Sequence, residues 1–303
     1  MLPGMLDLTR LRVLVAVARE GSVTAAAESL HYAQPSVSHH LAKLEAEVGV
    51  VLVRRVGRGV LLTDAGRLLV ARAEEILGQV EAAQAELAAH AGLGTGRVRL
   101  AAFPSALATL VPTAAARLAA EHPGVELALS EAEPPEALTA LRNGNVDAAL
   151  IFDHDDPLPG DRRNTTTTPL LQEAMYVVTP ADATWPGPRA ELSTYAGENW
   201  IAGCERCRTH LASICARAGF APRITFETDD YVAVQALVAA GLGVGVLPGL
   251  ALRAHRHPGV RADRLPGERR RVSLAVYGRP PAALPVQAFT TALTTAATEP
   301  QGC

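Results

Sequence analysis

The pattern of apolar positions at the start of the chain predicts two helices before residue 30. Leu8, Leu11, Val15 and Ala18 recur at helical spacing, and Gly21, a common helix stop, follows this segment. Ser22 can cap a second short helix, in which three consecutive alanines allow a partner helix to pack closely. The pattern therefore indicates a small helical domain.

A third helix is predicted to begin at Gln34 and Pro35, because proline is favoured in the first turn of a helix. Its apolar residues return at intervals of four, three and four and form one stripe: Val37, Leu41, Leu44 and Val48. The other faces carry Ser36, Ser38, His39, His40 and Lys43. Short hydrogen-bonding groups opposite a buried stripe suit a helix that reads base edges in the major groove of DNA, although an ordinary solvated face has the same periodicity.

Val50 to Leu62 is rich in β-forming residues and contains the turn Gly57-Arg58-Gly59, which predicts a two-stranded wing. We expect the arginines of this wing to contact backbone phosphates, with solvation of a loop as the alternative. They are Arg54, Arg55 and Arg58.

Thr63 can cap a long helix that runs toward His90, with Asp64 in its first turn. Apolar residues alternate along it at intervals of four and three: Leu69, Ala73, Ile76, Val80, Ala83 and Leu87. Because this spacing is typical of paired helices, we predict that the seam contacts a second copy of the chain. Packing of the helix on its own domain is the alternative. A hinge is expected at Gly92 to Gly96.

From Arg97 onward, strand and helix patterns alternate. Strands are predicted at 98–103, 125–130, 148–152, 175–178, 200–202, 223–228, 244–248 and 271–277. Helices are predicted at 106–121, 135–143, 207–218, 231–240 and 285–297. Such alternation implies parallel sheets and two α/β lobes with a cleft between them, the chain returning to the first lobe near Val272.

Length, composition and charge limit the class of protein. The 303 residues, 49% hydrophobic and 19% charged, are enough for two or three modules with cores, which excludes a disordered chain. No run of eighteen apolar residues and no export signal is present, so we expect a cytoplasmic protein without a membrane partner. The net charge is −3, yet residues 1–62 hold seven Lys or Arg against five Asp or Glu. The segment with the two-helix pattern is therefore the positive one.

The segment from Leu8 to Ile76 closely resembles the LysR-type transcriptional regulators, and the order of modules extends the resemblance along the chain. The matching residues are Leu11, Gly21-Ser22, Ala26-Ala27, Leu30, Gln34-Pro35, Ser38, Leu41, Leu44-Glu45, Gly49, Leu52, Arg55, Arg58, Leu62-Thr63 and Ala65-Gly66.

The resemblance implies an α+β multidomain protein. Its parts would be a winged helix-turn-helix DNA-binding domain over 1–62, a linker and dimerisation helix over 63–91, and a two-lobed α/β periplasmic-binding-protein-like effector domain over 92–303. Lobe I would cover about 97–168 and 268–303, and lobe II about 169–267. The resemblance also implies a homodimer or homotetramer that binds double-stranded promoter DNA and responds to a small-molecule effector. RNA polymerase is a further candidate partner.

Within this resemblance, the candidate DNA contacts are Gln34, Pro35, Ser36, Ser38, His39, Lys43, Arg55 and Arg58. Three positions depart from the family pattern, and one of them is Val53, which stands after Leu52 in place of the usual phenylalanine. Ala33 stands where a serine usually caps the recognition helix, and loss of a cap typically costs about 1 kcal/mol. His39 stands where arginine is common, and a neutral histidine cannot make the bidentate contact of arginine with guanine.

Ligands of two-lobed α/β folds bind where strands end and helices begin. Those ends carry the candidate effector residues Phe103, Pro104, Ser105, Phe152, Asp153, Gly203, Cys204, Thr228 and Asp229. In the family, the loop that corresponds to Phe103-Pro104-Ser105 and the loop that corresponds to Gly203-Cys204 commonly hold the effector. Ser105 is the favoured contact, and capping of the helix at 106–121 is its alternative role. Asp153, Asp155 and Asp156 make one wall acidic, so an anionic effector is not required.

Cys204 and Cys207 form a CxxC pair beside Arg206 and Arg208, near a helix start. Because such surroundings lower the pKa of a thiol, a thiol-redox-responsive regulator is an alternative function. The competing interpretation is two small, partly buried residues, with the arginines serving an anionic effector. Metal binding is weakly indicated, because no second CxxC completes a four-ligand site.

Enzymatic activity is not expected. No nucleophile elbow, phosphate loop or HExxH motif is present, so no catalytic residue, metal ligand or cofactor is assigned beyond the small-molecule effector. The competing classes are a solute-binding protein with an N-terminal appendage and an architectural DNA-binding protein without an inducer.

Overall fold

The computed structural model describes residues 6–57, 59–90, 96–154, 165–278 and 282–298. The chain divides into two compact units, of which the first comprises Met1–Ala88 and the short segment Arg142–Asn145. Each unit is described by itself. The predicted hinge at Gly92 to Gly96 falls almost wholly on residues 91–95, outside the described part of the chain.

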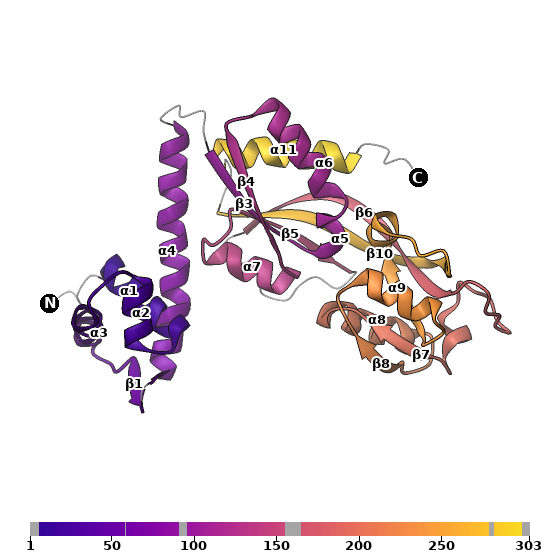
Figure 1. The fold of residues 1–303 in the computed structure, drawn as a ribbon, viewed down its shortest axis with the longest axis horizontal. Coiled ribbons are helices and arrows are strands. Elements are labelled where there is room, and N and C mark those ends of the chain that lie inside the picture. The colour runs from indigo at the N-terminus through magenta and orange to yellow at the C-terminus, as the bar shows by residue number, and fades with distance from the viewer. Residues whose placement is uncertain (1–5, 58, 91–95, 155–164, 279–281, 299–303) are drawn as a thin grey trace. The chain divides into compact units, whose positions relative to one another are not determined.

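Three helices form the core of the first unit: α1 (Leu8–Glu20), α2 (Val23–Ser29) and α3 (Gln34–Val48) (Figure 1). The Ser22 hydroxyl accepts a hydrogen bond of 3.0 Å from the Ala25 amide and caps α2, as predicted. Ala33 precedes α3 without a side-chain cap, also as predicted. The apolar stripe of α3 is buried at Val37, Leu41 and Leu44. It packs against α1 and α2 in one hydrophobic cluster.

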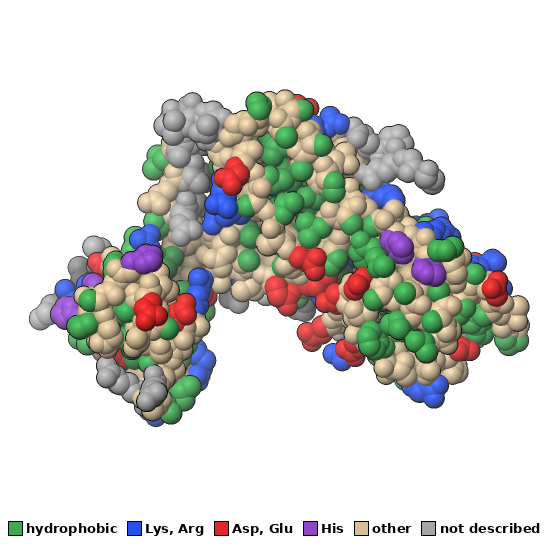
Figure 2. Space-filling view, viewed as in Figure 1, with side chains coloured by type: hydrophobic (Ala, Val, Ile, Leu, Met, Phe, Trp, Pro, Cys, Tyr) green, Lys and Arg blue, Asp and Glu red, His purple; other side chains and the backbone are tan. Residues whose placement is uncertain are grey.

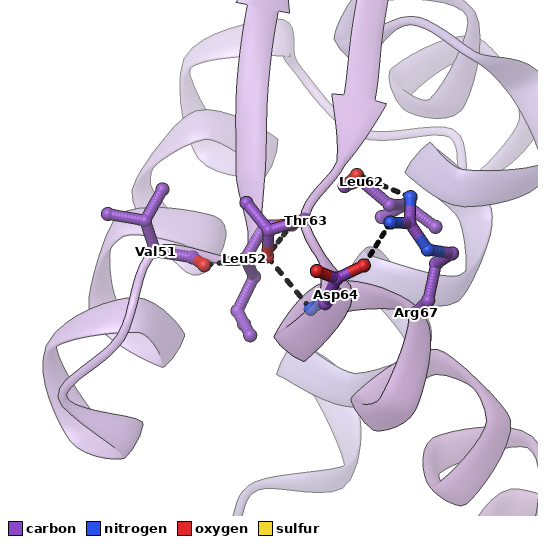
Figure 3. Close-up of polar contacts among 7 residues, drawn as sticks. Val51, Leu52, Leu62, Thr63, Asp64 and Arg67 are labelled. Atoms are coloured by element: carbon purple, nitrogen blue, oxygen red, sulfur yellow. Dashed lines mark hydrogen bonds and ion pairs between the residues drawn. The ribbon is translucent and has the colours of Figure 1, made fainter.

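The wing consists of β1 (Val53–Val56) and β2 (Gly59–Leu62), which pair antiparallel, and α4 (Asp64–His90) follows it directly. Thr63 joins the two (Figure 3). Its hydroxyl donates to the Val51 carbonyl at 2.8 Å and accepts from the Gly66 amide at 3.0 Å. A Cβ atom on Gly66 would collide with the Leu52 carbonyl oxygen. The wing and the first turn of α4 are therefore in backbone contact, which only glycine at 66 allows.

The predicted seam of α4 divides into two parts. Leu69, Ala73 and Ile76 pack against the core of their own unit, and Ala73 is fully buried there. Farther along the helix, Ala83 is exposed and Leu87 is 69% exposed. The first half of the seam therefore packs on its own unit, as the alternative expected, although Leu69 and Ile76 stay partly exposed and pairing there remains a prediction. Only the second half leaves apolar side chains uncovered in this unit.

The second unit is built on one eight-stranded sheet with the order β4-β3-β5-β10-β6-β9-β7-β8. Its strands are β3 (Gly96–Ala102), β4 (Val125–Glu131), β5 (Ala148–Asp153), β6 (Thr165–Pro180), β7 (Asn199–Ala202), β8 (Arg223–Glu227), β9 (Val244–Pro248) and β10 (Val260–Tyr277). Its helices are α5 (Pro104–Leu107), α6 (Leu110–Glu121), α7 (Pro134–Arg142), α8 (Glu205–Arg217), α9 (Tyr231–Ala239), α10 (Gly249–Ala254) and α11 (Leu284–Thr298), with a 3-10 turn, η1, at Leu192–Tyr195.

The predicted parallel pairing is confirmed in part. β3 pairs parallel with β4 and β5, and β7 pairs parallel with β8 and β9, but β10 is antiparallel to both β5 and β6. β6 and β10 are also far longer than the strands predicted at 175–178 and 271–277. They pair with each other from Val260 opposite Pro180 to Tyr277 opposite Thr165. This antiparallel ribbon belongs to both lobes.

Separate hydrophobic clusters fill the two lobes. In lobe I, α6 and α11 lie side by side over one face of the sheet (Figure 1), and α7 covers the other face. In lobe II, α8 packs in one cluster around Trp200, and α9 and α10 pack in another around Val178. Among the described residues, no helix is both long and apolar enough to cross a membrane.

Candidate functional sites

The first candidate site is the outward face of α3. Gln34, Pro35, Ser36, His39 and Lys43 are exposed, and Ser38 is partly exposed. The Gln34 amide donates to the Ser38 hydroxyl at 3.1 Å, one helical turn apart. The structure therefore brings together six of the eight residues predicted to contact DNA. The side chain of Arg55 and all of Arg58 lie outside the described residues.

Partly buried contacts fix α3 relative to the rest of its unit. The Arg10 guanidinium pairs with the Glu47 carboxylate at 2.9 Å and ties α1 to α3. One oxygen of Glu45 accepts from the Leu52 and Val53 amides, at 2.7 and 3.1 Å, and ties α3 to the wing. Glu45 and Glu47 are both partly buried, unlike the exposed polar side chains of α3. The polar side stays free to meet another molecule.

The second candidate site is a cleft between the two lobes. Eight of the nine predicted effector residues line one cavity of about 60 Å³: Phe103, Pro104, Ser105, Phe152, Gly203, Cys204, Thr228 and Asp229. The ninth, Asp153, does not line it. Asp153 is 3% exposed, and one of its oxygens lies 3.7 Å from the Arg206 guanidinium.

Arg270 forms the floor of this cavity. It is 3% exposed, and its guanidinium lies over the rings of Phe103 and Phe152, 4.8 and 4.4 Å from their centroids. Its Nε donates to Glu173 at 2.8 Å, and its Nη2 donates to the Ser105 hydroxyl at 3.0 Å. Because Glu173 supplies a carboxylate, the buried positive charge is compensated.

Ser105 does not cap a helix, contrary to its alternative role. The predicted helix at 106–121 is two helices, α5 and α6, and Ser105 lies inside α5. Its hydroxyl accepts from Arg270 instead, and no described residue accepts the proton of that hydroxyl. A buried hydroxyl normally donates as well as accepts. Ser105 therefore presents an unused donor to the cavity.

The thiol pair lines the same cavity, and its chemistry differs from the prediction. The Sγ atoms of Cys204 and Cys207 lie 3.1 Å apart at the start of α8. The hydrogen bond with Cys207 and burial raise the pKa of the Cys204 thiol, so the predicted lowering is wrong. The neighbouring arginines are also engaged elsewhere: Arg206 lies near Asp153, and Arg208 lies 3.4 Å from Glu227.

A second cavity of about 330 Å³ adjoins the first and shares Pro104, Glu133, Cys204 and Asp229 with it. Burial raises the pKa of Glu133, and the nearby Asp229 carboxylate adds to the effect. Burial also raises the pKa of Asp229, with Glu136 contributing. Both carboxylates are thus destabilised as anions. We call this second cavity the outer chamber and the first one the inner chamber.

A pair of stacked histidines lies next to this cleft. The rings of His154, just after β5, and His210, on α8, are 3.7 Å apart and nearly parallel. His154 is 5% exposed, and neither of its ring nitrogens makes a hydrogen bond of ordinary length to a described residue. Burial and the neighbouring His210 lower the pKa of His154 to about 2. The stack therefore depends on a neutral imidazole.

Sequence reasoning missed Arg270, Glu173 and Glu133. Arg270 stands in a run of three arginines that resembles a solvated surface. In a strand, however, side chains alternate between faces, and here Arg269 and Arg271 are exposed while Arg270 points inward. Recognising β10 as one long strand could have revealed this alternation. In the part of the chain that the structure describes, no group of three or more His, Cys, Asp or Glu residues is arranged to hold a metal ion.

Comparison with known proteins assigns a family model to each of two stretches of the chain. Residues 8–67 match the family model of bacterial regulatory helix-turn-helix proteins of the lysR family, and residues 91–298 match the LysR substrate binding domain. The probable HTH-type transcriptional regulator LrrA of Synechococcus elongatus is 31% identical, covering 81% of this chain and 82% of its own. A hydrogen peroxide-inducible genes activator of Dickeya chrysanthemi is 29% identical, covering 83% and 82%. A full-length OxyR variant from Pseudomonas aeruginosa has a TM-score of 0.68 at 28% identity, covering 97% and 95%.

Proposed function

The chain belongs to the LysR family of bacterial DNA-binding transcriptional regulators, and we propose that it reads promoter DNA with α3 under the control of a small molecule bound between its lobes. The observation that carries the proposal is the division of α3 into a buried stripe and an exposed polar face. A helix of this kind, followed by a wing, can enter a major groove while the rest of the unit holds it in place.

Gln34, Ser36, Ser38 and His39 are the proposed base-contacting residues, and Lys43 the proposed phosphate contact. Their side chains are short or flexible and lie on one exposed surface. Arg55 and Arg58 of the wing are proposed to contact phosphates on the strength of the sequence alone. Phosphate contacts would supply affinity, and the α3 side chains would supply sequence preference.

In vitro selection of bound sequences from a random DNA library, followed by gel-shift titration, tests this reading of α3. We expect His39→Arg to change the preferred base at one position of the site toward guanine, because arginine donates twice to guanine in the major groove. His122→Arg adds the same charge in the second unit and should leave the preference unchanged. Identical selected sequences for all three proteins would contradict the assignment of His39.

We propose self-association through the second half of α4. Ala83 and Leu87 are apolar and exposed in their own unit, whereas the first half of the seam packs at least partly on that unit. Leu87→Glu should shift the chain toward the monomer in light scattering, because a charge in a helix seam is costly to bury. Leu68→Glu, at an equally exposed leucine outside the seam, is the matched control. An unchanged mass for Leu87→Glu would refute this surface.

The inner chamber is the proposed effector site. Its walls come from both lobes, Phe103 and Phe152 supply apolar surface, and Ser105 offers a free hydroxyl donor. Apolar walls with a few convergent polar groups are typical of small-molecule sites. We expect the effector to place an acceptor group against Ser105 and the adjacent Arg270. Operator affinity measured with and without the effector tests this site. The change that the effector causes in the wild type should be lost in Ser105→Ala.

We also infer that the chain is a cytoplasmic regulator and not an enzyme, with no cofactor beyond the effector. The relatives it matches are transcriptional regulators, which supports this interpretation. RNA polymerase is the proposed further partner at the promoter. Deletion of residues 1–90 distinguishes a regulator from a solute-binding protein. A regulator then loses DNA binding, while its second unit can keep its ligand.

Thiol-redox control is a second candidate function. The 3.1 Å separation of the Cys204 and Cys207 sulfur atoms favours it, since only a small movement would bring them to bonding distance. The raised pKa of Cys204 opposes it, because the thiolate is the reactive form. Operator affinity should be compared before and after peroxide treatment in wild type and Cys204→Ser. Equal affinities throughout would remove this candidate.

A further inference from the structure

The end of β5 and the first turns of α8 meet in a contact between the two lobes. Asp153 ends β5 in lobe I and His154 follows it, while Arg206 and His210 lie one helical turn apart on α8 of lobe II. The rings of His154 and His210 are stacked, with centroids 3.7 Å apart and planes 5° from parallel. Beside them, the Arg206 guanidinium lies 3.7 Å from the Asp153 carboxylate. We call these four residues the interlobe clasp.

The interlobe clasp is continuous with the walls of the inner chamber. The Phe152 ring lines that chamber and lies edge-on to the His154 ring, with centroids 5.6 Å apart. On the side of lobe II, α8 carries Cys207, which also lines the inner chamber. Because β5 and α8 supply both the clasp and these two walls, separation of the clasp would open the inner chamber.

His154 fits this contact only as a neutral ring. It is 5% exposed, and neither ring nitrogen makes a hydrogen bond of ordinary length to a described residue. Burial first, and then the positive charges that face it from α8 and β10, lower its pKa to about 2; they belong to His210, Arg270 and Arg206. The backbone of Arg269, also on β10, favours a proton on His154, but its effect is the smallest.

The carboxylates around the interlobe clasp already face other cations. They are Asp153 beside Arg206, Glu173 of β6 beside Arg270, and Glu268 of β10 beside Arg217 and His210. Glu268 lies 3.6 Å from Nε2 of His210, so it serves the partner ring and not His154. A proton on His154 therefore gains no carboxylate partner, and a buried charge without one is costly.

We propose that the interlobe clasp is a proton-sensitive contact, in which a proton on His154 separates the two rings and loosens α8 from the end of β5. Once the contact opens, water reaches His154 and its pKa returns to the ordinary value of about 6.5. The closed contact is therefore favoured above that pH and is lost as the pH falls, by at most about tenfold per pH unit. The proposal goes beyond the proposed function, because it adds the proton as a second input to the cleft.

Modification of Cys207 by N-ethylmaleimide measures this release on the full-length chain, and peptide mass spectrometry assigns the label to each cysteine. Rates are measured from pH 8 down to about pH 5.5, below the ordinary pKa of histidine. Each wild-type rate is divided by the rate of His154→Phe at the same pH, which cancels the pH dependence of the thiol reaction. We expect a constant ratio above about pH 6.5 and a rise of up to about tenfold per pH unit below it. A constant ratio over the whole range would overturn the proposal.

Two controls separate the interlobe clasp from other histidines and from unfolding. His122→Phe, at the exposed histidine that follows α6, should give wild-type rates at every pH. Cys215 is buried in the cluster around Trp200 and reports loss of the core of lobe II. Modification of Cys215 in step with Cys207 would mean that lobe II unfolds, which would refute the clasp.

A substitution of the partner ring identifies the histidine that takes the proton. His210→Phe keeps two stacked rings and leaves His154 able to titrate, so the response of Cys207 to pH should persist. A response that is lost in His210→Phe and kept in His154→Phe would overturn the assignment to His154. His154→Leu, which is also uncharged, replaces His154→Phe if rapid modification of Cys215 at pH 8 shows that the phenylalanine variant does not fold.

Discussion

The Nη2 atom of Arg270 donates to the hydroxyl of Ser105 at 3.0 Å, across 165 residues of sequence. The bond joins the long strand β10 to the short helix α5 and closes the floor of the inner chamber. Glu173, on β6, holds the same guanidinium at 2.6 Å and also accepts from the Leu250 amide, at 2.6 Å. Four segments of the second unit thus meet at one buried cation.

Substitution of either partner of Arg270 should lower stability, and the loss should be larger for Glu173 than for Ser105. Glu173→Gln should lower the free energy of unfolding by about 3 kcal/mol, because it leaves a buried charge without its counter-ion. Ser105→Ala should cost about 1.5 kcal/mol, since the guanidinium keeps Glu173. Urea denaturation measures both, with Glu191→Gln, at an exposed carboxylate, as control. Equal losses for the two variants would mean that Glu173 does not compensate the charge.

The N-termini of α2 and α3 in the first unit differ in one respect, the presence of a capping side chain. Ser22 caps α2 through the Ala25 amide, whereas Ala33 precedes α3 with an extended backbone and no cap. We expect Ala33→Ser to stabilise the first unit by about 1 kcal/mol and Ser22→Ala to destabilise it by a similar amount. Thermal unfolding should show Tm shifts of opposite sign. Shifts in the same direction would show that another group already satisfies the first amides of α3.

The contact between the wing and α4 predicts that Gly66→Ala is severely destabilising. Its methyl group would meet the Leu52 carbonyl oxygen, a backbone atom held by the Thr63 amide at 2.9 Å. We expect a loss of about 2 kcal/mol or more, and weaker operator binding as the wing is displaced. Gly197→Ala, which meets nothing within 4 Å, should be nearly neutral. Wild-type behaviour of Gly66→Ala in urea denaturation and gel shift would rule out the close approach.

The His154 and His210 stack predicts acid sensitivity of the second unit. The pKa of His154 is lowered in the folded chain to about 2, so the unfolded chain binds a proton there below about pH 6.5 and the folded chain does not. Stability is therefore present above that pH and falls as the pH is lowered, by at most about 1.4 kcal/mol per pH unit.

His154→Phe keeps an aromatic ring in the stack and cannot be protonated, so it should flatten the decline in Tm between pH 7 and pH 5.5. His122→Gln, at an exposed histidine, should leave the slope unchanged. Glu133 and Asp229 act with the opposite sign, because carboxylates with raised pKa values stabilise the folded state as they become protonated. A wild-type slope in His154→Phe would assign the acid sensitivity to other groups.

The first unit could be predicted from sequence because its structure is set locally. The cap at Ser22, the proline at the start of α3 and the stripe from Val37 to Leu44 each act within a few residues. The second unit was predicted less well because distant contacts decide it. The strand β10 continues through Pro266 and Gly267, residues that usually end strands, because β6 pairs with it on both sides of this interruption.

The same contrast holds for the cleft. Eight of nine residues were placed there because strand ends and helix starts meet at predictable points. The groups that fix its charge, Arg270, Glu173 and Glu133, are recognised only when β10, β6 and α7 are seen together. A run of arginines in the sequence does not reveal which one faces inward.

The paired strands β6 and β10 limit how the two lobes can move when a ligand binds in the cleft. Since one hydrogen-bonded ribbon runs through both lobes, the lobes cannot swing freely as they would on two loose linkers. Their closure over a ligand must twist or bend that ribbon, most easily at the interruption of pairing between Arg264 and Arg269. We expect a stiff protein whose ligand response is a small elastic deformation, spread through a continuous backbone ladder.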